Sequence, residues 1–412
     1  MNRSDQVSRN KKSFGFISMG VFCILTFFTV IMPNSFQVAT AVTMVVSALA
    51  STLYVSMSDI SIKFFLFMLL NISLTLLYLL VGIINLAPEE AVKQVIIIYI
   101  ISPILWFFIL TALLTRLNEK SIISSFIVVA WLCCFSVFIF FYLFEKFGAS
   151  AVSFFIENPN IDTSEGYSGA TMHVYGSLIF IVGGFFAAPE VIRHKAVMFS
   201  TLVLLALTAI TSGRTALIIS IFLGLLIFLF FSSHKAISRK YKVALSLLIL
   251  VATAFVIYLA SEFRGLDISY LMNAIIDKLS SGGGSERANQ AQELIHSAFD
   301  SYGLGRGHGI GVDYIRSEDF PWRYENLWWA TLHRVGVLGS IIYVAPFLYY
   351  MFSTLAISIN RGLSSFEKFL FGGFICVFVA SNTNPYLEGV AFQWMYMLPV
   401  LALLIRDKKY EP

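Results

Sequence analysis

The sequence predicts an all-α protein that crosses a membrane many times. Three observations support this fold class: 58% of the 412 residues are hydrophobic, only 13% are charged, and the mean hydropathy is +0.81. A soluble protein could not cover so much apolar surface, whereas a lipid bilayer can. We expect no nucleic-acid partner. Because no strand–glycine-loop–helix unit for a nucleotide is visible, we also expect no direct use of ATP.

Apolar runs divide the chain into its predicted parts, because a helix needs roughly 17 to 25 apolar residues to cross a bilayer. We predict a cytoplasmic N-terminus at 1–13, nine spans within 14–260, a long outer loop at 261–323, three spans within 324–405, and a cytoplasmic tail at 406–412. The twelve spans are predicted at 14–32, 36–57, 64–86, 94–114, 122–144, 171–188, 196–211, 215–232, 243–260, 324–350, 366–384 and 389–405.

The distribution of Lys and Arg supports this topology. Basic residues collect in the segments that an even number of spans would leave in the cytoplasm, as the positive-inside rule requires. Outside the long loop, the opposite side holds only Lys93, Lys146 and Arg214. We therefore expect both termini in the cytoplasm. The first span is expected to be retained, since no small-residue cleavage site follows it.

The loop at 261–323 is the predicted functional region, because loops of such length without a purpose are uncommon. It holds an amphipathic segment at 288–299 and is rich in arginine. Arginine binds a phosphate or carboxylate through two parallel hydrogen bonds, which lysine cannot do. The alternative is that these arginines pair with acidic residues of the same loop. The basic residues are Arg264, Arg287, Arg306, Arg316 and Arg323, against Lys278 alone.

Arg214 lies in a very short turn between two predicted spans. Its guanidinium either reaches out to the membrane interface or faces a cavity inside the bundle, where an ion is functional by default.

Glu325 is expected in the first turn of a predicted helix. A carboxylate there, beside several arginines, could act as a general base; the alternative is an acidic helix start favoured by the macrodipole. Gly336 follows about three turns later and would share the face of Glu325, whereas Arg334 would point the opposite way. Gly336 and Gly339 would let a neighbouring helix approach closely.

A glycine cluster occupies 303–309. No strand precedes it, so a dinucleotide or P-loop site does not fit. It is either a tight turn that brings the backbone close to a ligand or a flexible loop. Trp322, Trp328 and Trp329 are expected in an interfacial aromatic belt, with sugar stacking as the alternative.

No metal site or disulfide is expected. The four cysteines all lie in apolar runs, and the histidines lack the spacing of metal ligands, so each histidine is expected at the surface or in packing. These residues are Cys23, Cys133, Cys134 and Cys376, with His173, His296, His308 and His333.

Several of these stretches, in their order along the chain, resemble the bacterial O-antigen polymerase and ligase superfamily. The resemblance covers the second half of the chain, and the first half is similar only in hydropathy. The stretch 212–217 resembles the arginine turn of the family, and Arg287 together with 303–309 resembles its long periplasmic loop. Glu325-Asn326, followed by Gly336-x-x-Gly339, resembles the His-Asn motif of its ligases. The stretch 381–385 resembles the segment that leads into its last span.

The resemblance implies a GT-C-like fold and an inverting glycosyl transfer that needs no metal or cofactor. The substrates would be undecaprenyl-diphosphate-linked oligosaccharides, joined at the periplasmic face of the bacterial inner membrane. Glu325 stands where the ligases have His, which favours a polymerase. Besides membrane lipid, the implied partners are a chain-length regulator and a flippase.

The resemblance also implies roles for individual residues. Glu325 would deprotonate the acceptor hydroxyl, and Arg214 and Arg287 would hold the diphosphate and stabilise the charge of the leaving group. The candidates for further substrate binding are Arg264, Arg306 and Asn326.

Two other functions remain open. The first is an O-antigen ligase, which transfers finished polymer to lipid A–core and would use the His that this chain lacks. The second is a lipid-linked oligosaccharide flippase, which would need charges within helices around a central cavity. The predicted spans are nearly uncharged, which favours the enzyme.

Overall fold

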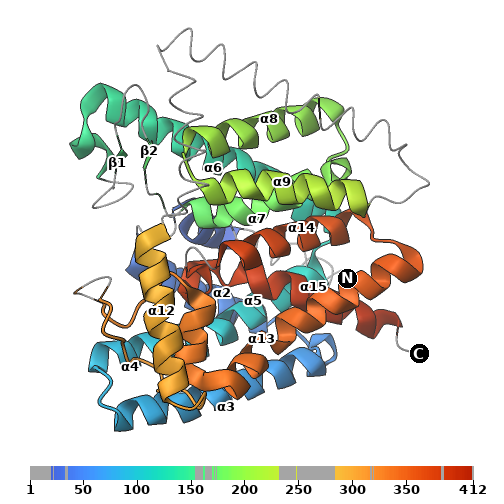
Figure 1. The fold of residues 1–412 in the computed structure, drawn as a ribbon. Helices are drawn as coiled ribbons and strands as arrows, with labels where there is room; N and C mark the ends of the chain where they lie inside the picture. The colour runs from blue at the N-terminus through green and yellow to red at the C-terminus, as the bar shows by residue number, and fades with distance from the viewer. Residues whose placement is uncertain are drawn as a thin grey trace.

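The computed structural model describes residues 20–21, 23–32, 36–153, 161–162, 169–170, 172, 174–231, 247, 284–315, 318, 320–381 and 385–410. Their regular structure is helical, apart from two short strands, β1 (Ile161–Asp162) and β2 (Gly169–Ala170), which pair antiparallel. Figure 1 shows the helices running mostly side by side. The prediction of a helical protein with apolar helices, suited to a membrane, is confirmed.

Four helical stretches in the described residues are long and apolar enough to cross a membrane. Between 23 and 35 residues long, they exceed the hydrocarbon thickness of about 30 Å at about 1.5 Å per residue. They are α3 (Ile62–Ile84), the continuous run of α4 (Glu89–Val95), η3 (Ile96–Ile101) and α5 (Ser102–Arg116), α6 (Glu119–Phe147) and α13 (Leu327–Arg361).

The remaining apolar helices are shorter, with 14 to 17 residues each. Four candidate spans are fewer than the twelve predicted. Hydropathy could not separate spans from core helices, because a helix enclosed by protein is as apolar as one enclosed by lipid. The shorter helices are α2 (Gln37–Thr52), α7 (Val174–Ala187), α8 (Lys195–Thr211), α9 (Thr215–Phe230), α14 (Ser365–Ala380) and α15 (Trp394–Tyr410).

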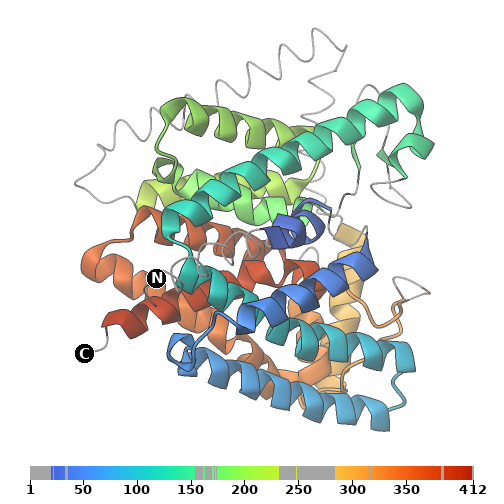
Figure 2. The same ribbon diagram turned by 180° about the vertical axis from the view of Figure 1, so that it is seen from behind.

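The core is built around α7, whose residues are all buried. It packs against α14 and α9 through small residues. A Cβ added at Gly183 would lie 2.8 Å from the carbonyl oxygen of Gly372, so side chains there would force the two helices apart. Seen from behind, the first third of the chain, in blue to cyan, lies in front of the C-terminal helices and packs against them (Figure 2).

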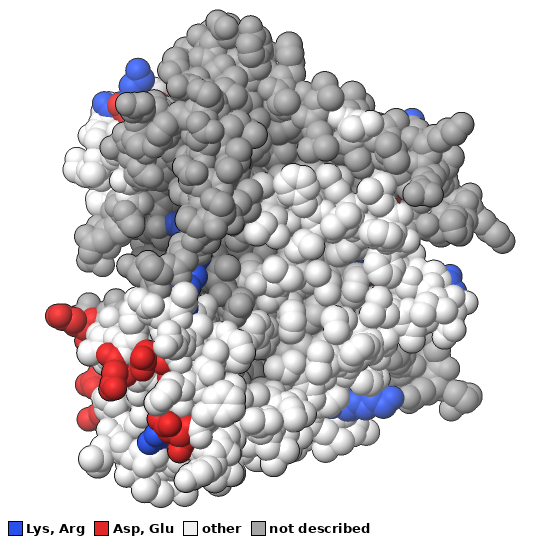
Figure 3. Space-filling view, in the orientation of Figure 1, with Lys and Arg blue, Asp and Glu red and all other residues white. Residues whose placement is uncertain are grey.

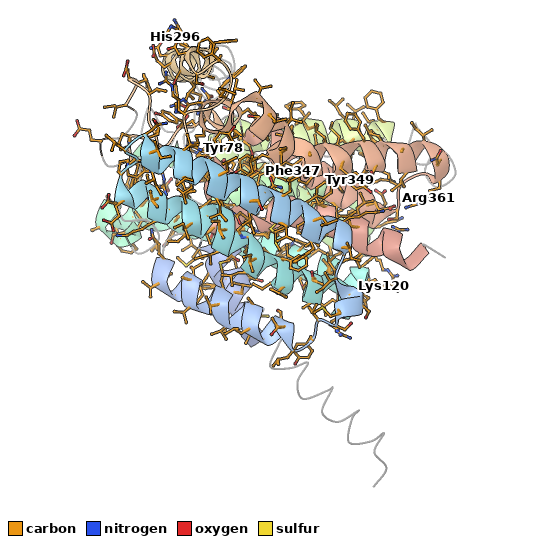
Figure 4. All side chains as sticks on the ribbon, turned by 90° about the horizontal axis from the view of Figure 1, so that it is seen from below. Tyr78, Lys120, His296, Phe347, Tyr349 and Arg361 are labelled. Carbon is orange, nitrogen blue, oxygen red and sulfur yellow. The ribbon has the colours of Figure 1, made fainter. Side chains whose placement is uncertain are left out.

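Helix α12 (Gly284–Asp300) crosses one end of this bundle. Its buried residues Gln290, Leu294 and Ala298 recur every four positions, which confirms the amphipathic pattern. Figure 4 shows His296 of α12 at one end of the helices and Lys120 and Arg361 at the other. Acidic side chains gather at the α12 end, whereas the flank of the bundle is nearly uncharged (Figure 3).

Candidate functional site

Arg287 and Glu325 contact each other directly at the α12 end of the bundle. Arg287 Nε donates to Glu325 Oε2 at 2.6 Å, and the two side chains are 34% and 18% exposed. Glu325 lies just outside α13, whose N-cap is Asn326, and not in its first turn as expected. The carboxylate therefore keeps access to solvent and to a guanidinium at once.

Gln290 fixes this contact and was missed in the sequence. Its buried side chain accepts hydrogen bonds from the backbone N–H groups of Glu325 (2.7 Å) and Asn326 (3.0 Å). In return, the Asn326 amide donates to the carbonyl of Arg287 at 2.7 Å. These bonds clamp α12 to the start of α13. Gln290 could have been noticed in the sequence because it is a polar residue on the apolar face of an amphipathic segment.

Arg214 is the N-cap residue of α9 and faces the bundle. Its guanidinium lies over the ring of Tyr175 on α7, 5.8 Å from the ring centroid. Its backbone N–H donates to the hydroxyl of Ser212 at 3.2 Å. Of the two readings left open for Arg214, this placement favours the one in which it faces inward.

Tyr386 is a tyrosine on which the charges of all three predicted catalytic residues act. Burial raises the pKa of its phenol to about 12; the positive charges of Arg214 and Arg287 oppose this rise, and the carboxylate of Glu325 adds to it. Tyr386 is thus within electrostatic reach of all three predicted catalytic residues. Its ring lies on the backbone of α7, where a Cβ at Gly176 would come within 2.9 Å of it. The sequence indicated only that the neighbouring stretch, 381–385, matters.

The remaining predicted site residues are placed differently. Arg264 lies outside the described residues, as does Arg316. Arg306 is exposed. Its main-chain N–H donates to the carbonyl of His333 at 2.8 Å, and its carbonyl accepts from the side chain of Asn85 at 2.8 Å. That the Arg306 side chain binds substrate therefore stays a prediction.

The glycine cluster at 303–309 packs backbone against backbone. Gly303, Gly305, Gly307 and Gly309 all have positive φ values, between 70° and 97°. A Cβ at Gly305 would lie 2.5 Å from the backbone nitrogen of Gly336. Of the two readings left open, these conformations favour the tight turn over the flexible loop, and its close neighbours include the backbones of α3 and α13.

Gly336 breaks the regular path of α13, with φ 65° and ψ −173°. The break leaves the carbonyl of Arg334 free to accept from Gly307 at 2.9 Å, while Val337 N–H donates to Gly303 at 2.9 Å. The prediction that Gly336 shares a helix face with Glu325 is wrong for this reason, since the helical arithmetic does not continue through the break. Gly339 is approached by Tyr78 of α3.

A second ion pair, between Arg334 and Glu388, lies inside the protein and was not predicted. The side chains are only 5% and 9% exposed. Glu388 also accepts from the hydroxyl of Tyr99 at 2.9 Å, and Arg334 donates to the carbonyl of Trp322 at 2.8 Å. The pair ties α13 and η3 to the short turn Tyr386–Glu388, and so it holds Tyr386 in place.

An apolar cavity of about 140 Å³ adjoins the site. Its lining includes Leu327 and Trp328, which directly follow Asn326, and Leu387, which directly follows Tyr386. The other walls come from α3, α5 and α15. A ligand with a charged head and an apolar chain could contact both regions at once.

The described histidines serve in packing or at the surface, as predicted. His333 contacts Ser297 and the carbonyl of Ile310 through its two ring nitrogens, and His308 contacts Tyr343 at 3.0 Å. His296 is exposed and pairs with Asp300. Within the part of the chain that the structure describes, no cluster of three or more metal-binding side chains occurs.

Comparison of the chain with protein-family models found no match, and a search of curated proteins found no similar protein. The family resemblance noted in the sequence is therefore a proposal, and the site geometry is what supports it.

Proposed function

We propose that the protein is a polysaccharide polymerase of the bacterial inner membrane, which joins undecaprenyl-diphosphate-linked oligosaccharide repeat units at the periplasmic face. One observation carries this proposal. Arg287 and Glu325 are 38 positions apart in the chain, yet they meet at 2.6 Å at one end of an apolar helical bundle. The carboxylate could act as a general base, and the guanidinium could bind a diphosphate, so the pair supplies groups for two roles of the proposed glycosyl transfer.

In the proposed reaction, Glu325 takes the proton of the acceptor hydroxyl. That oxygen attacks the anomeric carbon of the donor sugar, and the bond from this carbon to the diphosphate oxygen breaks. The anomeric configuration inverts, and undecaprenyl diphosphate leaves. Arg287 and Arg214 stabilise the charge that develops on the diphosphate. When the diphosphate binds, it competes for Arg287, which releases Glu325 from its ion pair.

The cavity beside the site supports a lipid-linked substrate. Its lining includes Leu327, the residue after Asn326, and its surface is mainly apolar, although a few polar side chains such as Asn71 and Gln393 contribute to the lining. A segment of the isoprenoid chain fits such surroundings, because transfer of apolar surface from water is favourable. The diphosphate would then lie near Arg214, Arg287 and Tyr386.

The proposed topology has twelve helices in a GT-C-like arrangement, with both termini in the cytoplasm. The shorter helices would supply further spans, and the predicted span at 243–260 lies outside the described residues apart from residue 247. Lys120 and Arg361 lie at the end opposite α12, as the positive-inside rule requires if α12 is periplasmic (Figure 4). In this proposal Arg264 and Arg306 assist substrate binding, and Asn326 holds α12 through its bond to Arg287.

The proposal is tested by a lipopolysaccharide gel of a strain that lacks the gene, complemented with wild type, Glu325→Gln or Glu90→Gln. Glu90 is an exposed carboxylate of α4 and serves as the matched control. We expect core plus a single repeat unit from Glu325→Gln and a full ladder from Glu90→Gln. A full ladder from Glu325→Gln, with no polymer made by the purified wild-type protein from lipid-linked repeats, would overturn the proposal. Bare core with accumulated lipid-linked polymer in the deletion strain would identify a ligase.

A further inference from the structure

An exposed apolar cluster, here called the apolar tip, is formed by Phe299, Tyr302 and Leu304. These side chains end α12 and form the turn after it, and they are 74%, 91% and 70% exposed. The other exposed residues described on α12 are alanine or polar: Ala288, Asn289, Gln292, His296 and Asp300. Apolar exposure on this helix is therefore confined to its last turn and the residues that follow.

The backbone holds the apolar tip in this position. Helix α12 ends with Tyr302 N–H donating to Phe299 at 2.8 Å and Gly303 N–H donating to Ala298 at 2.9 Å. Tyr302 has a φ of 54°, in the left-handed region that favours glycine or asparagine at a helix end. An aromatic residue is unusual in this conformation, and the side chain of Tyr302 is 91% exposed.

The apolar tip continues the apolar flank of two membrane-length helices. Val337 N–H of α13 donates to the carbonyl of Gly303 at 2.9 Å, and the hydroxyl of Tyr78 on α3 donates to the carbonyl of Leu304 at 2.8 Å. On α13, the next exposed side chains are Leu338 and Ile341. Lipid is the expected neighbour of that flank, and the apolar tip lies at its edge.

Two of the three tryptophans predicted as an interfacial belt, Trp322 and Trp328, face the protein instead. Trp322 is buried and donates to Gln94, and the ring of Trp328 lies 4.6 Å from that of Phe378. Trp329 is exposed, at 38%, which is consistent with the predicted interfacial position, but it is less exposed than Phe299 or Tyr302. Among the described aromatic side chains of this region, those of Phe299 and Tyr302 are far more exposed, at 74% and 91%, than those of Phe320 and Trp329.

We propose that the apolar tip inserts into the headgroup region of the leaflet on the α12 side and anchors the end of α12 at the membrane surface. Tyrosine suits this depth, because its ring is apolar and its hydroxyl remains hydrated. The anchor holds α12 flat across the end of the bundle. It thereby keeps Arg287, at the other end of the helix, at a constant depth. The inference does not depend on the proposed function.

The test places a nitroxide label at position 302 of the full chain. Tyr302→Cys is made in a Cys23→Ser background, because Cys23 is exposed while the other three cysteines are buried. His296→Cys is the matched control, since His296 lies on the same helix and its side chain is 74% exposed. Leu304→Cys provides a second position within the apolar tip. The Cys23→Ser protein without a second substitution measures background labelling.

The labelled proteins are reconstituted in vesicles of phosphatidylethanolamine and phosphatidylglycerol. We expect labels at 302 and 304 to be relaxed more by oxygen, which concentrates in lipid, than by a water-soluble nickel chelate. The label at 296 should show the reverse. Equal accessibility of 302 and 296 to the nickel chelate would overturn the proposal. Shielding of 302 from both reagents would overturn it too, because protein, such as a second copy of the chain, would then cover the apolar tip.

Discussion

Two arginine–glutamate pairs lie on either side of the first turns of α13, and their surroundings are opposite. The pair Arg287–Glu325 is 34% and 18% exposed, and its two side chains contact each other at 2.6 Å. The pair Arg334–Glu388 is 5% and 9% exposed, and it is surrounded by Tyr99 and the carbonyl of Trp322. The accessible pair can exchange its partner for a ligand, whereas the buried pair cannot.

The difference teaches how a membrane protein can use the same two side chains for opposite purposes. A buried ion pair loses its hydration, so removing one partner leaves an uncompensated charge. A partly exposed pair keeps solvent as an alternative partner, so its separation costs little. We therefore expect stability to depend on the buried pair and activity to depend on the accessible one.

The largest expected effect comes from breaking the buried pair. Arg334→Met leaves Glu388 charged in an apolar interior, and we expect a loss of about 3–5 kcal/mol in folding free energy. Thermal unfolding of the detergent-solubilised protein should show a much lower midpoint and a reduced yield. The double variant Arg334→Met with Glu388→Leu removes both charges and should recover most of the stability. An unchanged midpoint for Arg334→Met alone would show that the pair contributes nothing.

The next effect concerns the accessible pair. Arg287→Lys keeps the charge but not the planar fork that binds two oxygens, and we expect polymer formation to fall by about 10²–10³-fold. The unfolding midpoint should stay close to that of wild type, because the side chain is partly solvated. Arg193→Lys, an exposed arginine outside the site, is the control and should retain activity. If Arg287→Lys lost stability and activity together, the contrast between the two pairs would fail.

A smaller effect is expected at Gln290, which positions the accessible pair without belonging to it. Gln290→Leu removes the acceptor of two backbone N–H groups, and leaving such groups unsatisfied costs about 1–3 kcal/mol. Gln290→Glu keeps an acceptor but adds a negative charge beside Glu325. Because the side chain at position 290 is only 2% exposed, we expect Gln290→Glu to lose some stability, and to move the acid limb of its rate–pH profile to higher pH. An unshifted profile would mean that Gln290 acts on stability alone.

The sequence predicted the types of residue at the site better than it predicted their supports. Arg214, Arg287 and Glu325 stand out because ions are rare in this chain, and the structure brings all three within electrostatic reach of Tyr386. Gln290 was not singled out, because its hydrogen-bond partners lie 35 and 36 positions away and no local sequence pattern predicts such bonds.

The fold shows the same limit. Apolar runs predicted helices near the right places, but they could not predict which helices lipid surrounds. Helix α7 is wholly buried, whereas much of α3 is exposed, and both sequences are strongly apolar. The position of Gly336 was predicted from an unbroken helix. Its positive φ lets the backbone turn there, and contacts with the distant 303–309 loop stabilise that turn.

The smallest expected effect is a pH dependence near the buried pair, at His308. Burial and the positive charge of Arg334 lower the pKa of His308 to about 3, well below the ordinary value of about 6.5. Between these values the unfolded chain binds a proton that the folded protein does not, so stability rises with pH. The contribution of His308 is fully present above about pH 6.5 and is lost as the pH falls toward about 3.

His308→Gln removes this titration and keeps a polar group that can reach Tyr343. We expect the unfolding midpoint of the wild type to drop more than that of His308→Gln when the pH is lowered from about 7 to about 5. A second variant, His296→Gln, removes an exposed histidine, and its unfolding midpoint should drop as much as that of the wild type. Equal drops in all three proteins would show that His308 is not held neutral. The charge of Arg334 would then be screened from it, and the interior around the Arg334–Glu388 pair would be more hydrated than its 5% and 9% exposure indicates.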